Sequence, residues 1–185
     1  MICLTHQKLL SFRIFADDTN TYLSADNKVD LEKNVSHEFK LVLEYYTLNK
    51  LSVNFKMTNY MVITSPKRKA DINISGIKQV NSLKYLGIYI DDKLNWKAQI
   101  RHVNNKLSKN LGIIYKLRRY LNLHTLKQIY YTLIYPFLTY GLTSWGNTYK
   151  TTYAKIITKQ NKCVRAMFFA NKRENADPYY GILDY

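Results

Sequence analysis

Two adjacent carboxylates, Asp17 and Asp18, follow a short apolar run and precede Thr19 and Asn20. Neighbouring carboxylates held close to a core repel each other unless a cation or hydrogen-bond donors offset their charge. Enzymes that transfer phosphoryl groups use two divalent ions about 3.5–4 Å apart to hold the attacking and leaving oxygens. Asp, Thr and Asn also favour turns, so the pair fits either a metal-dependent catalytic site or an ordinary turn.

A second Asp-Asp pair, Asp91 and Asp92, serves as an internal comparison. It precedes Trp96 and a long segment with helical apolar periodicity. An Asp near a helix start can accept free backbone N–H groups and complement the positive end of the helix dipole. We therefore expect this pair to have a structural, helix-capping role.

The first half of the chain shows the patterns of short strands around one helix. Apolar residues at 9–15 and 21–23 flank Asp17 to Asn20, which predicts a hairpin with both carboxylates at or near its tip. Leu31, Val35, Phe39, Val42 and Tyr46 have helical spacing and predict a helix over residues 29–48. Residues 51–63 read as a strand pair or an extended segment. Residues 72–77 and 83–90 predict a second hairpin, with strand content ending near residue 91.

The second half is predicted to be helical throughout. The apolar positions Ile100, Val103, Leu107, Leu111 and Ile114 form one stripe of a long helix that starts near residue 96. Further helices are predicted over residues 126–135, before Pro136, and over 152–169. The tail after residue 170 reads as irregular. The fold class is therefore α+β, with a mixed part over residues 1–92 and an all-helical part over 93–185.

The charge balance favours a polyanionic partner. The chain has 28 Lys and Arg against 13 Asp and Glu, a net charge of +15, together with 17 Tyr. Tyrosines interleaved with cations, as in residues 115–120, suit a surface that meets phosphates and stacks on bases. A merely basic soluble protein is the alternative to a nucleic-acid-binding one.

Cysteine spacing and hydropathy exclude several other classes of protein. Cys3 and Cys163 lie far apart, with no CxxC pair and no Cys/His cluster, so neither a disulfide scaffold nor a zinc site is indicated. No apolar run approaches the roughly 18 residues of a membrane span, and the N-terminal residues make a poor signal peptide. We expect an intracellular protein without a membrane partner.

Several segments, taken in order, resemble the reverse transcriptases of non-LTR retrotransposons of the jockey-like type. Residues 15–19, FADDT, resemble the catalytic hairpin, and NKLSVN at 49–54 with TNYM at 58–61 resembles the next motif of the palm, the subdomain that carries the catalytic aspartates. KYLGIYID at 84–91 with LNW at 94–96 resembles the primer-gripping hairpin and the entry to the thumb. Residues 135–147 also fit, and the resemblance covers nearly the whole chain from residue 12.

The resemblance implies a C-terminal palm fragment over residues 1–92, consisting of antiparallel hairpins plus a helix, and an all-helical thumb and connection over 93–185. Asp17 would be a metal ligand of the catalytic centre, and Asp18 would shape the site or contact the metal less directly. The cofactor would be Mg²⁺, with Mn²⁺ as a substitute. The reaction would add deoxynucleoside triphosphates to a DNA primer on an RNA template. The primer grip would comprise Tyr85, Leu86 and Gly87.

Two further roles follow with their alternatives. Gly87 would let the hairpin backbone approach the primer end, or it would be an ordinary bulge. The template–primer duplex would be contacted by a basic helix face, for which a merely solvated face is the alternative; this face carries Lys97, Arg101, Lys106 and Lys109.

The sequence departs from the family pattern in two ways. The family needs a further metal-binding Asp on an earlier palm strand, which would lie before residue 1, so we expect negligible polymerization by this chain alone. The family also shows a Lys before the Thr that Thr58 matches, where this sequence has Met57. Lys56 is one position early, and on a strand it would face the opposite side, which makes it a doubtful substitute.

Two alternatives to a polymerase fragment stay open. The chain could be a non-catalytic, basic nucleic-acid-binding module, whose binding would be salt-sensitive and unaffected by Asp17→Asn. It could also be a reading frame from a dead element that does not fold. The family acts on chromosomal targets, which implies nuclear residence, while the sequence indicates no oligomeric state.

Overall fold

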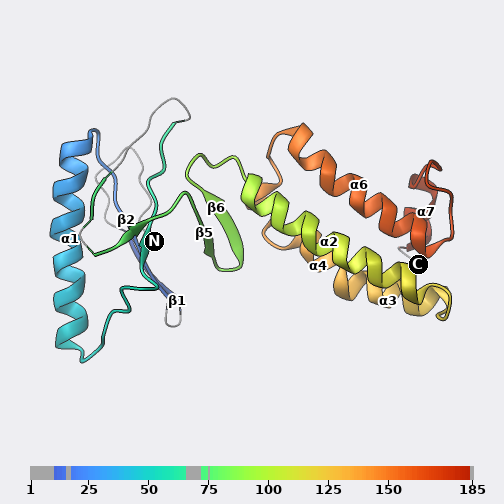
Figure 1. The fold of residues 1–185 in the computed structure, drawn as a ribbon, viewed down its shortest axis with the longest axis horizontal. Helices are drawn as coiled ribbons and strands as arrows, with labels where there is room; N and C mark the ends of the chain where they lie inside the picture. The colour runs from blue at the N-terminus through green and yellow to red at the C-terminus, as the bar shows by residue number, and fades with distance from the viewer. Residues whose placement is uncertain (1–10, 16–17, 66–71, 75, 184–185) are drawn as a thin grey trace. The chain divides into compact units, whose positions relative to one another are not determined.

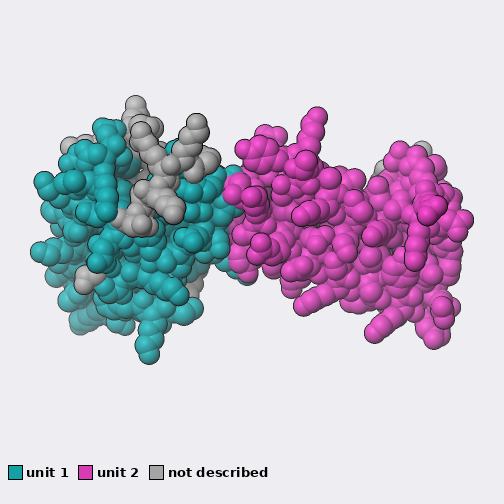
Figure 2. Space-filling model, turned by 45° about the horizontal axis from the view of Figure 1, so that its top comes forward, with its two compact units in different colours: residues 1–85, 90–94 teal, residues 86–89, 95–185 magenta. Residues whose placement is uncertain are grey.

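A computed structural model describes residues 11–15, 18–65, 72–74 and 76–183. The chain divides into two compact units, one made of residues up to 85 with 90–94, the other of residues 86–89 with 95–185 (Figure 2). Unit 1 combines one long helix with short strands, and the regular elements described after residue 95 are all helices. The α+β class is therefore confirmed, while the assignment of the halves to palm and thumb stays a prediction.

The predicted N-terminal hairpin is present. Strand β1 (Ser11–Phe15) pairs antiparallel with β2 (Asp18–Tyr22), and Phe15 lies opposite Asp18. Because pairing resumes at Asp18, Thr19 and Asn20 are strand residues and not turn residues as predicted. Asp18 lies beside the tip, as expected, whereas Asp17 lies outside the described residues.

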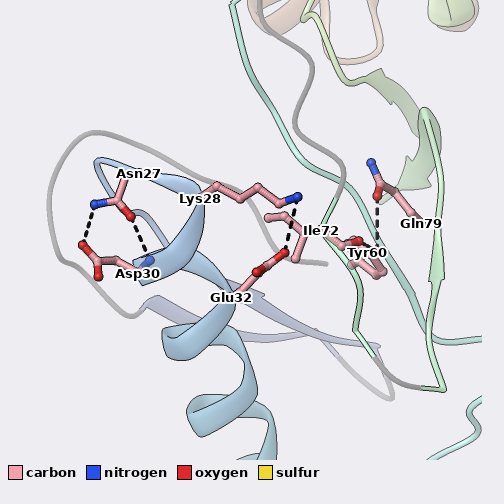
Figure 3. Close-up of polar contacts among 7 residues, drawn as sticks. All are labelled: Asn27, Lys28, Asp30, Glu32, Tyr60, Ile72 and Gln79. Carbon is pink, nitrogen blue, oxygen red and sulfur yellow. Dashed lines mark hydrogen bonds and ion pairs between the residues drawn. The ribbon is translucent and has the colours of Figure 1, made fainter.

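Helix α1 (Lys28–Leu48) follows the predicted range to within one residue at its start. Asn27 caps it, because the Asn27 Oδ1 accepts the backbone N–H of Asp30 at 2.9 Å while its Nδ2 donates to the Asp30 carboxylate at 2.7 Å (Figure 3). Such a cap satisfies an N–H group that the helix itself leaves unpaired. Leu31 and Val35 turn inward and are buried.

The remainder of unit 1 has less strand than predicted. Among the described residues between α1 and residue 81, the paired strands are β3 (Asn59–Tyr60) and β4 (Lys78–Gln79), which run parallel. The buried Tyr60 hydroxyl donates to the carbonyl of Ile72, which ties the segment around Ile72 to β3 (Figure 3). These segments close a small core with β2 and α1, formed by Leu23, Leu31, Val35, Tyr60, Val62, Ile72 and Ile74.

The second hairpin has different strands from those predicted. Residues 83–90 do not pair with 72–77 but fold back on themselves, as β5 (Ser82–Tyr85) and β6 (Ile88–Asp91). Leu86 and Gly87 have φ of 45° and 85°, and two successive left-handed residues form the tight turn that suits a two-residue hairpin loop. Strand content ends at Asp91, as expected.

The capping role predicted for the second Asp pair is wrong. Helix α2 (Lys97–Leu117) begins five residues after Asp92, and the side chain that accepts its first backbone N–H, from Lys97 at 3.0 Å, is Asn95. Asp91 Oδ1 instead accepts the backbone N–H of Lys93 at 3.3 Å, and the carboxylate of Asp92 lies 4.0 Å from the Lys93 ammonium. The pair therefore shapes the turn between β6 and the helix.

Unit 2 contains the predicted long helix and a set of shorter helices around it. All five positions of the predicted apolar stripe of α2 are buried. Helix α6 (Lys150–Met167) is shifted by two residues from its prediction. The helix predicted before Pro136 ends before it, as expected, and Pro136 itself lies in the first turn of the next helix. The other helices are α3 (Leu123–Leu133), α4 (Tyr135–Thr139), α5 (Leu142–Trp145), α6 (Lys150–Met167) and α7 (Asp177–Leu183).

The tail was predicted to be irregular, but it contains α7. Ala176 and Leu183 are buried at the two ends of this helix, and Leu183 joins the core of unit 2. Pro178 occupies the first turn, where its missing N–H costs no hydrogen bond. The tail is therefore ordered by packing that a short, polar sequence does not reveal.

Gly141 offers a test of the packing in unit 2. Its φ is +64°, and a Cβ at this position would lie 2.3 Å from Ile88 Cδ1. We expect Gly141→Ala to lower the free energy of unfolding by more than roughly 1–2 kcal/mol, the cost of a left-handed alanine alone. Gly112 lies within α2 with open space around it, so Gly112→Ala should instead stabilise the helix by about 0.5–1 kcal/mol. Urea melts of both variants that shift in the same direction would contradict this packing.

Candidate functional site

Unit 1 contains a pocket of about 530 Å³ that is lined mainly by four separate parts of the chain. Strand β2 provides one wall, a face of α1 provides another, and residues 52–60 with the end of β5 complete it. Of these four, β2, residues 52–60 and the end of β5 belong to segments in which the sequence resembled palm motifs, whereas α1 does not. The structure therefore brings residues from distant sequence positions to one place.

The β2 wall of the pocket is polar. Asp18 is exposed at its edge, and the Thr19 hydroxyl accepts a hydrogen bond from the Tyr46 hydroxyl of α1. Asn20 is only 5% exposed, and its Nδ2 has no hydrogen-bond partner among the described residues. A buried amide donor without a partner is costly, so this wall suits a ligand or chain segment that brings an acceptor.

The α1 wall is mainly apolar. Val35, Phe39, Val42 and Tyr46 recur every three or four residues and therefore share one face of the helix. Phe39 also makes an edge-to-face contact with Phe55, with ring centroids 6.4 Å apart. The helical spacing of the sequence predicted this apolar face. It did not reveal that part of the face lines a pocket.

Residues 54–58 form a tight turn. The sequence pattern predicted that they are part of a strand, on which Lys56 and the next residue would face opposite sides. The Asn54 carbonyl accepts the backbone N–H groups of Met57 and Thr58, each at 3.0 Å, while Asn54 Oδ1 accepts the N–H of Lys56 at 3.2 Å. The strand rule of opposite faces therefore does not apply here. Met57 lines the pocket and Lys56 does not, although both side chains are exposed.

The three residues assigned to a primer grip are divided between two environments. Tyr85 lines the pocket beside Lys84. Leu86 and Gly87 form the hairpin turn, and the Tyr140 hydroxyl donates to the Leu86 carbonyl at 2.6 Å. A Cβ on Gly87 would lie 3.2 Å from the Tyr140 ring, so the glycine is explained by its φ of +85° and this close contact. Its approach to a primer stays a prediction.

The four basic residues assigned to duplex binding are all exposed on α2. Lys97 and Arg101 are four residues apart and share one side of the helix, while Lys106 and Lys109 are three apart and share another. Lys106 also lies 5.8 Å from the centre of the Phe137 ring. The cations form a broad face opposite the buried stripe and not a single row.

Charge in the helical half of the chain is more one-sided than the overall balance suggests. Residues 93–173 contain no Asp or Glu at all, a signal that simple counting along the sequence would have found. The same stretch contains 16 cations: Lys93, Lys97, Arg101, Lys106, Lys109, Lys116, Arg118, Arg119, Lys127, Lys150, Lys155, Lys159, Lys162, Arg165, Lys172 and Arg173. A segment without internal counter-charges is suited to a polyanion.

The buried polar groups of unit 2 support its core and not a reactive site. Burial raises the pKa of the Cys163 thiol to about 12 and that of the Tyr130 hydroxyl to about 12. Both groups therefore stay protonated at neutral pH, and a protonated thiol is a poor nucleophile. No group of three or more His, Cys, Asp or Glu within the described ranges could hold a metal ion. Cys3 lies outside those ranges, and none of their helices is long and apolar enough to cross a membrane.

Comparison with known proteins gives two relatives. The chain is 24% identical over 168 residues to a retrovirus-related Pol polyprotein from the type-1 retrotransposable element R1 of Bradysia coprophila, a match covering 85% of this chain. It is 28% identical over 104 residues, 53% of this chain, to a probable RNA-directed DNA polymerase from transposon BS of Drosophila melanogaster. The matches span only 16% and 11% of those proteins. No protein-family model and no solved structure matches the chain.

Proposed function

We propose that this chain, which is related in sequence to the reverse transcriptases of non-LTR retrotransposons, forms the C-terminal palm and the thumb of an RNA-directed DNA polymerase. The palm part comprises residues 1–92, and the thumb with its connection comprises 93–185. The complete enzyme copies an RNA template by adding deoxynucleotides to the 3′ hydroxyl of a DNA primer. The match to an element polyprotein over 85% of the chain supports this assignment.

The observation that carries the proposal is the composition of the pocket in unit 1. Its lining combines Asp18 from the hairpin that resembles the catalytic motif with Lys84 and Tyr85 from the primer-grip segment. The following motif contributes Asn54, Met57 and Thr58. In the resemblance to reverse transcriptases, all three segments belong to one catalytic region. A palm requires these three segments to meet at one site, and they line one pocket here. An unrelated basic protein has no such requirement.

The described residues do not by themselves hold Mg²⁺. Asp18 is the one carboxylate of the resembled motif among them, and a hard cation such as Mg²⁺ is bound through several oxygens in near-octahedral geometry. We assign Asp17 and Asp18 as contributors to a magnesium site that requires a further carboxylate from another segment. No catalytic step is therefore attributed to this chain alone.

Primer extension tests the proposed function. With an RNA template, a DNA primer, deoxynucleoside triphosphates and Mg²⁺ or Mn²⁺, we expect no extension by the purified chain, because the proposed magnesium site requires a further carboxylate from another segment. An Asp17→Ala variant run beside it should give the same blank. Extension that disappears in Asp17→Ala would show that the chain contains a complete site and would overturn the predicted inactivity.

The acid-free stretch over residues 93–173 favours a second candidate function, a non-catalytic nucleic-acid-binding module. Such a module binds through phosphate contacts, so its affinity falls steeply with salt. Asp17→Asn distinguishes the two candidates. In a polymerase remnant that still positions metal and primer, Mg²⁺ should change the affinity for a primer end in the parent chain but not in the variant. In a simple binding module, the two proteins should respond to Mg²⁺ identically.

A further inference from the structure

The end of unit 2 where α2 and α6 finish carries an arginine between two aromatic side chains. The helices run side by side in the same direction (Figure 1). The guanidinium Nη1 of Arg118 donates to the Ala166 carbonyl at 3.3 Å. The rings of Tyr115 and Phe169 each have their centre 4.8 Å from the guanidinium carbon. We name Tyr115, Arg118 and Phe169 the Arg118 cluster.

Phe169 has a left-handed backbone conformation, which is unfavourable for a phenylalanine, and its apolar side chain is exposed to solvent. Its φ is 56°, and it directly follows Phe168, the C-cap residue of α6. The Ala170 N–H donates to the Arg165 carbonyl at 3.0 Å, the bond that closes a helix end at which glycine is usual. The Phe169 side chain is nevertheless 60% exposed. Neither backbone preference nor burial explains a phenylalanine here, and strain of this kind is found at functional sites.

The surroundings of the cluster are strongly basic. Lys116 and Arg119 are exposed beside it in sequence, Lys172 and Arg173 are exposed just after Phe169, and Tyr120 is 84% exposed. The first acidic residue, Glu174, already accepts hydrogen bonds from the Asn171 N–H at 3.0 Å and from the Tyr179 hydroxyl, and its pKa is lowered mainly by that hydroxyl. No salt bridge among the described residues joins a carboxylate to Lys116, Arg119, Lys172 or Arg173, so these four cations can meet an external anion.

We propose that the Arg118 cluster is a binding site for single-stranded nucleic acid. Unpaired bases would stack on the exposed rings of Phe169 and Tyr115, which Arg118 holds in place, while the flanking cations meet the phosphates. A duplex keeps its base faces stacked on one another, so an exposed ring recognises an unpaired strand. This site is separate from the basic residues proposed to contact the duplex on the earlier part of α2, and it does not rest on them.

Fluorescence anisotropy with short labelled oligo(U) and oligo(dT) tests this site and distinguishes RNA from DNA as the bound strand. Phe169→Gly removes the ring and supplies the residue that the backbone prefers. We expect about tenfold weaker binding of single strands, from the loss of one stacked base, with a melting temperature that does not fall. Tyr149→Ala, which removes an aromatic side chain that is 72% exposed before α6, should bind like the parent chain.

Three results would overturn the proposal. The first is single-strand binding by Phe169→Gly that equals the parent chain. The second is competition by a blunt duplex at the same phosphate concentration that is as strong as competition by a single strand. The third is displacement of the labelled oligonucleotide by poly-glutamate as effectively as by a single strand of equal total charge. That result would show a site that binds acidic polymers through charge alone, without stacking.

Discussion

Replacing Trp145 with alanine is expected to destabilise unit 2 by about 3–5 kcal/mol, because the largest fully buried side chain of the described core is lost and a cavity remains. The Trp145 indole is 0% exposed, its Nε1 donates to the Tyr140 carbonyl at 2.9 Å, and its ring lies 6.1 Å from that of Tyr153. The residue therefore anchors the turn after α4 to α6.

Urea denaturation followed by circular dichroism measures this effect. Trp145→Phe retains part of the packing but loses the indole N–H, so its loss of stability should be smaller. Tyr149→Ala removes a mostly exposed side chain and should change the free energy of unfolding by less than about 0.5 kcal/mol. A Trp145→Ala variant as stable as Tyr149→Ala would contradict the described core.

The second large effect concerns duplex binding. Changing Lys97, Arg101, Lys106 and Lys109 together to glutamine removes four exposed cations from α2. If all four meet phosphates, the slope of log affinity against log salt for a template–primer duplex should fall by about 3.6, at roughly 0.9 per contact. The affinity should fall by orders of magnitude at low salt, while the helix stays folded because the buried stripe is untouched.

The matched control removes the same charge from α6, by changing Lys150, Lys155, Lys159 and Lys162 to glutamine. Both variants have the same net charge, so general electrostatic attraction falls equally in the two. A larger loss of slope in the α2 variant would identify α2 as the face that meets the duplex. Equal losses would contradict a defined face and would indicate diffuse attraction.

Features encoded by local periodicity were predictable from the sequence. The α2 stripe from Ile100 to Ile114 and the α1 face from Leu31 to Tyr46 repeat at helical spacing, and both helices occur where that spacing placed them. The hairpin around Asp18 followed from apolar runs on both sides of the polar residues Asp17 to Asn20. For these elements the burial of one face is sufficient to determine the local structure.

Features that depend on backbone turns or tertiary contacts were not predictable in this way. The turn at Leu86 and Gly87 divided a run that reads as one strand, because a left-handed leucine has no sequence signature. The side on which Lys56 would lie was predicted from strand geometry, and that prediction does not hold because residues 54–58 form a turn. The buried donor of Asn20 and the placement of Phe169 beside Arg118 appear only once distant segments are brought together.

The most direct test of the palm and thumb assignment is photo-crosslinking from a primer that carries 5-iodo-deoxyuridine at its 3′ end, annealed to an RNA template and bound to the chain. Mass spectrometry then identifies the cross-linked peptide. We predict adducts at Tyr85 or elsewhere within the hairpin of β5 and β6, and their loss when an unlabelled primer–template competes. Adducts confined to α6 or to the Arg118 cluster, with none in the hairpin, would contradict the assignment of residues 84–91 as a primer grip.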